Sequence, residues 1–164
     1  MSLKTPRNPM PTQEAKERIH NFQEVALGYD EETVRLEAQR CLNCKKPKCV
    51  QGCPVEIDIP AFITEVVNKN YQKAADIIKN KNSLPAVCGR VCPQENQCEK
   101  LCILGIKQEP VAIGRIERFV ADWEAEYGLN KETKTVEPTG KKVAIVGAGP
   151  AGLTCAGDLA KLGH

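Results

Sequence analysis

Eight of the nine cysteines fall into two compact groups. The first group reads C-x2-C-x4-C-x3-C-P and the second reads C-x3-C-P-x4-C-x3-C. The members are Cys41, Cys44, Cys49 and Cys53 in the first group, and Cys88, Cys92, Cys98 and Cys102 in the second. Thiolates are soft ligands that suit both zinc and iron–sulfur clusters. Both groups are therefore candidate metal sites.

The spacing within the groups favours iron–sulfur over zinc. Zinc sites usually combine two widely separated C-x-x-C pairs, often with histidine, whereas each group here is compact and contains none. The Cys-Pro that ends the first group matches the bacterial ferredoxin run, whose fourth cysteine ligates the other cluster. Two extra residues between Cys44 and Cys49 distinguish it from a plain ferredoxin. We predict two 4Fe–4S clusters; a zinc-stabilised structural or interaction domain is the alternative.

The lysines inside the first group and the ninth cysteine need a separate interpretation. Lys45, Lys46 and Lys48 lie between ligands of the first group. They either form an ordinary solvated loop, or raise the cluster's reduction potential and guide an acidic partner. Cys155 stands apart, inside the last predicted helix, and is expected to be a small buried hydrophobic residue.

Composition excludes several classes of function. The formal net charge is +2 with the signs well mixed, so no basic stripe indicates nucleic-acid binding. The N-terminal residues lack the apolar stretch of a secretory signal, and no run of eighteen apolar residues indicates a membrane span. We expect a cytoplasmic protein, in which structural disulfides are disfavoured.

The chain is predicted to be mainly α, with four parts. Residues 1–28 form a lead-in and a helix, 29–128 a helical 4Fe–4S domain, 129–140 a polar linker, and 141–164 a truncated FAD- or NAD(P)-binding βα unit of Rossmann type. Within the domain, Asp30 is a plausible N-cap for a helix over 31–42, and Asp58 with Pro60 indicates another helix start. Short helices are expected over 61–67 and 71–80, and each four-residue pair in the second cysteine group is expected on one side of a helical turn.

The most regular helical pattern covers residues 110–129. Its apolar face is formed by residues at helical spacing, namely Ile113, Ile116, Val120, Trp123 and Tyr127. Glu117 lies about 100° from Ile116, at the edge of this face. The residue is either a solvated boundary residue or part of a site.

A glycine motif follows the linker. "KKVAIVGAGPAG" places Gly147, Gly149 and Gly152 in a G-x-G-x-x-G pattern after a predicted strand at 143–146 and before a helix. Such glycines allow a tight turn and close approach to a dinucleotide pyrophosphate at a helix N-terminus. The acidic residue expected about twenty residues further on is not reached before His164. We therefore expect a fragment that by itself does not bind FAD or NAD(P) tightly and is inactive.

The whole pattern resembles the start of the glutamate synthase small (β) subunit. The resemblance rests on both cysteine groups, "VEIDIPAFI", "PVAIGRIERFVADW" and "KKVAIVGAGPAGL", in this order, and covers the chain from about residue 20. The same module is similar to the N-terminal region of dihydropyrimidine dehydrogenase. The resemblance implies an α-helical ferredoxin-like domain with two 4Fe–4S clusters, attached to an FAD- and NADPH-binding oxidoreductase body.

In such proteins NADPH reduces FAD, and electrons then pass through the clusters to a partner flavin. In glutamate synthase the partner flavin is FMN on the large subunit, where 2-oxoglutarate and glutamine-derived ammonia become glutamate. A pyrimidine-reducing or other NADPH-linked flavoprotein is the alternative. Neither assignment places a catalytic residue in this chain.

The resemblance also implies exchange of ligands between the two cysteine groups. One cluster takes Cys41, Cys44, Cys49 and Cys102. The other takes Cys53, Cys92, Cys98 and a fourth ligand. In the dihydropyrimidine dehydrogenase pattern this fourth ligand is a glutamine that aligns with Glu117, and Cys88 is its rival. Because such a cluster joins residues about sixty positions apart, the metal-free protein is expected to be loose or unfolded.

Overall fold

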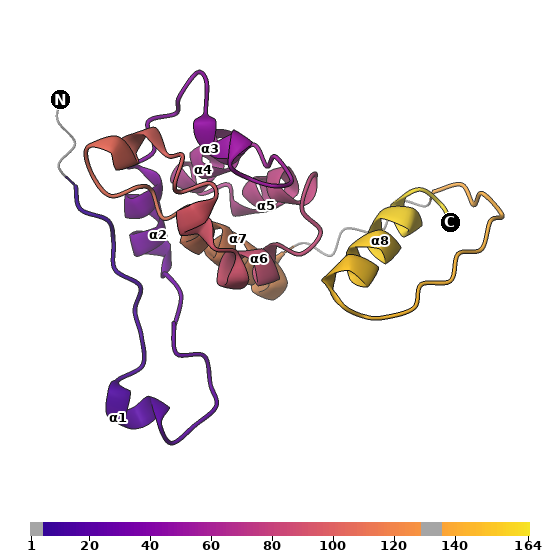
Figure 1. Ribbon diagram of the computed structural model, residues 1–164, viewed down its shortest axis with the longest axis horizontal. Helices are drawn as coiled ribbons and strands as arrows, with labels where there is room; N and C mark the ends of the chain where they lie inside the picture. The colour runs from indigo at the N-terminus through magenta and orange to yellow at the C-terminus, as the bar shows by residue number, and fades with distance from the viewer. Residues whose placement is uncertain (1–4, 129–135) are drawn as a thin grey trace.

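The computed structural model describes residues 5–128 and 136–164, and it is mainly helical (Figure 1). Within these residues there is no β-strand, and a single isolated antiparallel bridge joins Thr12 to Ala26. The α-helices are α1 (Ala15–Arg18), α2 (Glu31–Ala38), α3 (Lys48–Gln51), α4 (Ile59–Val67), α5 (Tyr71–Lys79), α6 (Pro85–Val91), α7 (Ile113–Tyr127) and α8 (Pro150–Lys161). Two 3₁₀ turns, η1 (Gln94–Asn96) and η2 (Ile103–Ile106), lie between α6 and α7. The expected mainly helical fold is confirmed.

Two helix starts lie where the capping residues predicted them. The Asp30 carboxylate accepts a hydrogen bond of 2.7 Å from the Thr33 N–H at the start of α2. Asp58 accepts one of 3.2 Å from the Ala61 N–H at the start of α4, with Pro60 in its first turn. Each carboxylate satisfies a backbone donor that lacks a partner within the helix. These caps begin the two helices that bracket the first cysteine group.

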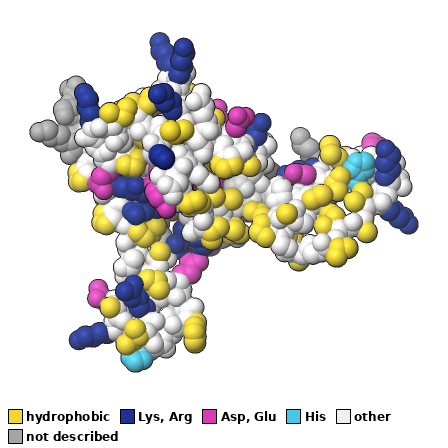
Figure 2. All heavy atoms as spheres, in the orientation of Figure 1, with side chains coloured by type: hydrophobic (Ala, Val, Ile, Leu, Met, Phe, Trp, Pro, Cys, Tyr) yellow, Lys and Arg dark blue, Asp and Glu magenta, His cyan; other side chains and the backbone are white. Residues whose placement is uncertain are grey.

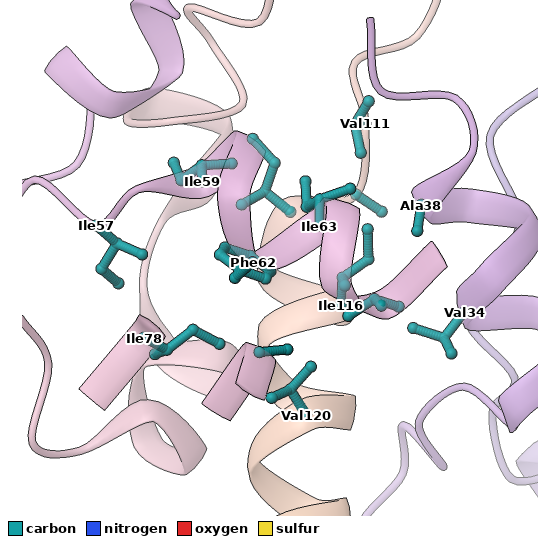
Figure 3. Close-up of a cluster of buried hydrophobic side chains, with 14 of the residues drawn as sticks. Val34, Ala38, Ile57, Ile59, Phe62, Ile63, Ile78, Val111, Ile116 and Val120 are labelled. Atoms are coloured by element: carbon teal, nitrogen blue, oxygen red, sulfur yellow. The ribbon is translucent and has the colours of Figure 1, made fainter. Parts of the chain in front are cut away.

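Helices α2, α4, α5 and α7 pack around one apolar core (Figure 3). Val34, Phe62, Ile116 and Val120 are fully buried at its centre. The predicted apolar face of α7 is confirmed along its first two turns, while Trp123 is half-buried and Tyr127 is exposed. The core therefore fixes α7 against α2 and α4, the helices that lie on either side of the first cysteine group.

The helix expected within residues 1–28 is present but only four residues long. Only α1 is helical, and the chain on either side of it forms a narrow arm that projects from the helical body (Figure 1). Backbone hydrogen bonds of 2.8 Å link Gln13 to Val25 and Leu27 to Pro11 across the arm. No residue of α1 is buried. A short helix with no face to bury is marginal in water, so the helix formers in this segment do not suffice.

The predicted strand at 143–146 is also not formed. Residues 136–148 carry no regular secondary structure, because a strand needs a neighbour to complete its hydrogen bonds and the described residues supply none. The helix that follows is present as α8, but Cys155 is exposed, so the expected burial of its side chain is wrong. Residues 129–135 of the predicted linker lie outside the described residues.

None of the helices in the described part of the chain is long and apolar enough to cross a membrane.

Candidate metal centres

Four cysteines from distant parts of the chain line one small pocket. Three belong to the first group and the fourth comes from the second; they are Cys41, Cys44, Cys49 and Cys102. Apolar residues of α4, α7 and the segment before α7 complete the lining, among them Ile59, Ile63, Val111 and Ile113. A soft donor set gathered in an apolar surrounding fits an iron–sulfur cluster.

Local backbone structure places these four thiols. Cys41 follows the end of α2, Cys49 lies in α3, and Cys102 precedes η2. Between Cys41 and Cys44, Asn43 adopts a left-handed conformation with φ of 45°. Asparagine tolerates this region better than most residues, so the chain can turn between the two cysteines.

Two thiols of this pocket, Cys41 and Cys49, favour the neutral form when no metal is bound. Burial, together with the neighbouring thiols of Cys102 and Cys41, raises the pKa of Cys49 to about 11. Burial also raises the pKa of Cys41. A thiolate at these positions needs nearby positive charge, which iron supplies by displacing the protons.

A second set of donors gathers around Cys53, Cys92 and Cys98. Burial raises the pKa of Cys92 to about 12, with further contributions from Cys88, Glu117 and Cys53. Burial raises the pKa of Cys98 to about 12 as well, and charges on Glu99, Cys53 and Glu117 add to the effect. These mutual effects show that the side chains share one neighbourhood. The described structure therefore also brings together the second set of predicted site residues.

Glu117 lies beside this second set and is buried, with 7% of its surface exposed. The interpretation of Glu117 as a solvated boundary residue is therefore wrong. Burial raises its pKa to about 7, against the opposing effect of a hydrogen bond from Asn82. The Asn82 amide donates to Glu117 Oε1 at 2.8 Å, and the Cys88 thiol donates to Asn82 Oδ1 at 3.6 Å. Asn82 thus orients both rival ligands, and sequence reasoning missed it.

Gly52 allows the two cysteine groups to approach each other. A Cβ at this position would lie 2.6 Å from the Gln97 carbonyl oxygen and 3.1 Å from Cys98 Cα. Real Cβ atoms do not come this close to backbone. Any side chain at position 52 would therefore push the segment that carries Cys53 away from the segment that carries Cys98.

Gly52→Ala is expected to destabilise the protein by about 1–3 kcal/mol and to lower the iron content of the second site, because the added methyl group overpacks a backbone contact. Urea unfolding and iron analysis of the purified variant test this. Gly105→Ala is the matched control, since a Cβ there would meet Pro110 at an ordinary distance of 3.5 Å. Equal behaviour of the two variants would contradict the assignment of Gly52.

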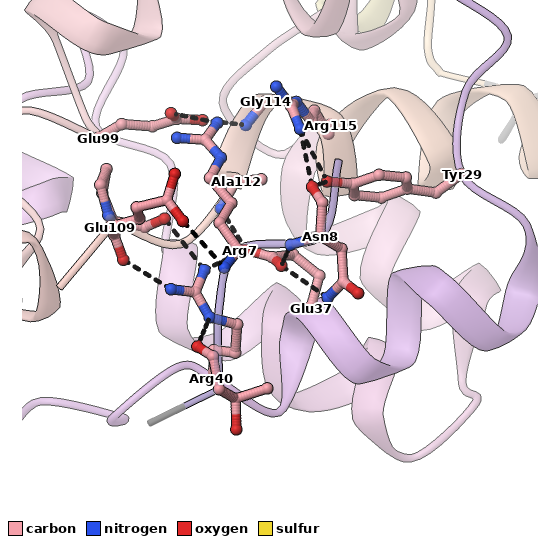
Figure 4. A network of polar contacts seen from close by, with 12 residues as sticks. Arg7, Asn8, Tyr29, Glu37, Arg40, Glu99, Glu109, Ala112, Gly114 and Arg115 are labelled. Atoms are coloured by element: carbon pink, nitrogen blue, oxygen red, sulfur yellow. Dashed lines mark hydrogen bonds and ion pairs between the residues drawn. The ribbon is translucent and has the colours of Figure 1, made fainter. Parts of the chain in front are cut away.

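A buried polar network braces the segments that carry the thiols (Figure 4). Glu37 is fully buried and pairs with Arg40 at 2.6 Å. It also accepts hydrogen bonds from the Ala112 N–H at 2.9 Å and from the Asn8 N–H at 2.8 Å. Arg40 in turn donates to the carbonyl oxygens of Glu109 and Pro110 at 2.7 and 3.1 Å. The network joins α2, the N-terminal segment and the start of α7.

The same network reaches the residues between Cys98 and Cys102. Glu99 is buried; it pairs with Arg7 at 2.8 Å and accepts a hydrogen bond from the Gly114 N–H at 3.3 Å (Figure 4). Sequence reasoning missed Glu37, Arg40 and Glu99. One signal was available for Glu37. It lies three residues after Val34 and four before Cys41, on the face of the helix that the apolar pattern assigns to the interior.

The predicted glycine motif forms a tight turn before α8. Gly147 has φ of 104°, which favours glycine, and Gly149 is the N-cap of α8. A Cβ at Gly152 would collide with the Gly147 carbonyl oxygen. The turn therefore requires glycine at the first and third positions, as a dinucleotide-binding turn does.

Two thiol-rich donor sets within one small helical domain are typical of iron–sulfur proteins. No set of three or more His, Cys, Asp or Glu side chains in residues 5–128 and 136–164 is arranged to hold a single metal ion. The chain belongs to the family of dihydropyrimidine dehydrogenase domain II, 4Fe–4S cluster, whose model matches residues 18–129. The matched residues contain both cysteine groups and Glu117.

Curated relatives include subunits of two kinds of oxidoreductase. The glutamate synthase [NADPH] small chain of Escherichia coli K12 is 41% identical over 153 residues, which is 93% of this chain and 32% of the relative. The NAD-dependent dihydropyrimidine dehydrogenase subunit PreT of the same organism is 41% identical over 128 residues, which is 78% of this chain and 31% of the relative. The chain thus spans about a third of the length of these relatives. The expected resemblance to both groups is confirmed.

Proposed function

We propose that this chain is the electron-transfer module of an NADPH-dependent glutamate synthase. In this proposal electrons pass from FAD through two 4Fe–4S clusters to a flavin on the large subunit, where glutamate is formed. The observation that carries it is the convergence of Cys102 with Cys41, Cys44 and Cys49 on one pocket, in a chain that belongs to a 4Fe–4S family. FAD and NADPH would bind to the full-length protein, with the turn at Gly147, Gly149 and Gly152 facing a dinucleotide pyrophosphate.

The proposed ligands follow from the two donor sets. The first cluster takes Cys41, Cys44, Cys49 and Cys102, and the second takes Cys53, Cys92, Cys98 and Glu117. We assign Glu117 rather than Cys88 as the eighth ligand. Glu117 is a buried carboxylate on the central helix α7 and acts on both Cys92 and Cys98, whereas Cys88 is only partly buried and its thiol donates to Asn82. We keep the division of the chain into a lead-in with a helix (1–28), a helical 4Fe–4S domain (29–128), a linker (129–140) and a truncated FAD- or NAD(P)-binding βα unit (141–164).

Metal analysis tests the function. Anaerobically purified protein is expected to contain about eight irons and about eight acid-labile sulfides per chain, with an EPR signal after dithionite reduction. Zinc in place of iron, persisting after anaerobic reconstitution, would overturn the redox assignment in favour of a structural zinc domain.

Two variants decide the eighth ligand. Glu117→Ala is expected to lower iron content by up to about half and to remove the EPR signal of one cluster, because a buried oxygen ligand is lost. Cys88→Ala is expected to keep all of its iron. Loss of iron in Cys88→Ala with full retention in Glu117→Ala would transfer the assignment to Cys88.

A dihydropyrimidine dehydrogenase-like module is the second candidate, favoured by the equal identity to PreT. The match to the glutamate synthase small chain covers more of this chain, which favours the first candidate. Co-purification of the full-length protein from its source with a glutamine-dependent large subunit would support glutamate synthase. Co-purification with a pyrimidine-reducing subunit would support the second candidate.

A further inference from the structure

Two segments that line the pocket of the first thiol set are basic and carry no acidic residue. They are residues 41–48 and 100–107. All five of their lysines are exposed: Lys45, Lys46, Lys48, Lys100 and Lys107. None of the five forms an ion pair with another described residue. Figure 2 shows basic side chains over the loop that joins α2 to α3.

Acidic side chains beside the first segment make contacts of their own. Asp58 and Glu65 line a shallow groove beside Cys44 and Lys45. Asp58 caps α4 through the Ala61 N–H, and Glu65 pairs with Lys73 at 2.6 Å. Glu65 is thus paired with another lysine, and the single charge of Asp58 is smaller than the five positive charges of the two segments. Local positive potential here is therefore available to a partner.

The same two segments also expose apolar side chains. Leu42 and Ile106 are 47% and 77% exposed, and Leu101 and Ile103 are also exposed. Leu42 and Ile103 line the same pocket as the four thiols. An apolar centre with a charged rim is the usual composition of a protein–protein interface.

The composition of the surface favours a protein over a nucleic acid. Neither segment contains arginine or an aromatic residue. Nucleic-acid surfaces rely on arginine for bidentate contacts to phosphate and on aromatic rings for base stacking. Lysines around exposed leucine and isoleucine instead suit a protein surface with carboxylates around an apolar patch.

We propose that residues 41–48 and 100–107 form a docking surface for an acidic patch on the large subunit that accepts the electrons. This inference rests on the proposed function. The lysines guide the approach of the partner, and Leu42 and Ile106 are buried in the complex. Docking on this surface places the partner beside the pocket that Leu42 lines together with Cys41 and Cys44.

Binding of the reconstituted full chain to purified glutamate synthase large subunit tests the proposal. The wild-type complex is expected to weaken strongly between about 20 mM and about 500 mM sodium chloride, because screening shortens the range of the attraction. Lys45→Glu/Lys46→Glu is expected to lower the association rate constant about tenfold or more at low salt. The matched control Lys16→Glu/Lys81→Glu makes the same change of charge at exposed positions elsewhere. It is expected to change the association rate constant less than about twofold.

Two further readouts support the assignment. Leu42→Ser is expected to raise the dissociation rate constant, since it removes apolar contact from the centre of the interface. Zero-length carbodiimide crosslinking is expected to join Lys45, Lys46 or Lys48 to carboxylates of the large subunit. Salt-independent binding, no binding, or equal effects of the two double variants would overturn the proposal. Self-association of the chain that is abolished by the Lys45/Lys46 variant would also overturn it in favour of a second copy.

Iron and EPR measurements on the same samples separate this proposal from the proposed function. Normal iron content with no selective effect of Lys45 and Lys46 overturns the docking surface alone. Absence of iron after reconstitution overturns the electron-transfer function, whatever the binding result.

Discussion

Cys102→Ser is expected to leave the protein with about half of its iron and to lower its stability more than any other single cysteine replacement outside the first group. Cys102 is the member of the first pocket that is supplied by the second cysteine group. Without Cys102, the cluster no longer links residues that lie about sixty positions apart in the chain. Because the cluster binds only the folded chain, loss of this ligand removes binding free energy that stabilises the folded state.

Cys155→Ser is the matched control for this prediction. The Cys155 side chain is exposed on α8, outside both donor sets. The Cys155→Ser variant is expected to keep all of its iron and to unfold at the same urea concentration as the wild type. Iron analysis, EPR after reduction and anaerobic urea unfolding check both variants. Unchanged iron in Cys102→Ser, or equal loss in Cys155→Ser, would contradict the shared pocket.

Glu37→Gln is expected to destabilise the protein by about 3–5 kcal/mol at neutral pH, because it leaves the buried Arg40 cation without its charged partner. Arg40 is 3% exposed, so little water reaches it to replace the carboxylate. At the start of α7, the Ala112 N–H would also lose a charged carboxylate acceptor and keep at most a weaker, neutral amide acceptor. Anaerobic urea unfolding measures the effect.

Glu32→Gln is the control, since Glu32 lies exposed on the same helix. It is expected to change the free energy of unfolding by less than about 1 kcal/mol. A loss in Glu37→Gln no larger than in Glu32→Gln would mean that the buried pair adds nothing to stability.

The pH dependence of this pair gives a second test. Burial works to raise the pKa of Glu37, but hydrogen bonds from Asn8, Ala112 and Arg40 outweigh it and hold the pKa below its usual value of 4.5. The stability from Glu37 is therefore fully present above about pH 4.5 and is lost as the pH falls through the lower folded-state pKa. The difference between wild type and Glu37→Gln is expected to shrink on acidification. A difference that grows would contradict this sign.

Local chemistry alone determined several features of this protein. Asp30 and Asp58 predicted two helix starts because a cap needs only the adjacent backbone. The glycine spacing predicted the tight turn before α8, because the backbone conformation of a turn also depends on residues that are adjacent in the chain. The apolar periodicity of residues 113–120 predicted the buried face of α7. The cysteine spacing indicated iron–sulfur chemistry, and the family match supports it.

Features that depend on distant neighbours were decided only by the tertiary structure. The segment around α1 lacks a packing partner and forms an arm, and residues 143–146 lack a neighbouring strand. Cys155 lies on an exposed part of α8. Helix propensity, strand propensity and hydrophobicity each require a partner surface before they determine structure.

Burial of charge was the other property that the sequence did not determine. Glu117 lies at the edge of a helical face, and only the packing of α7 beside Asn82 and the second thiol set makes it a buried acid with a raised pKa. Glu37 and Arg40 are likewise ordinary helix residues until the N-terminal segment and the start of α7 close over them. The free energy of a buried charge depends on all the groups that surround it, and these groups come together only in the folded chain.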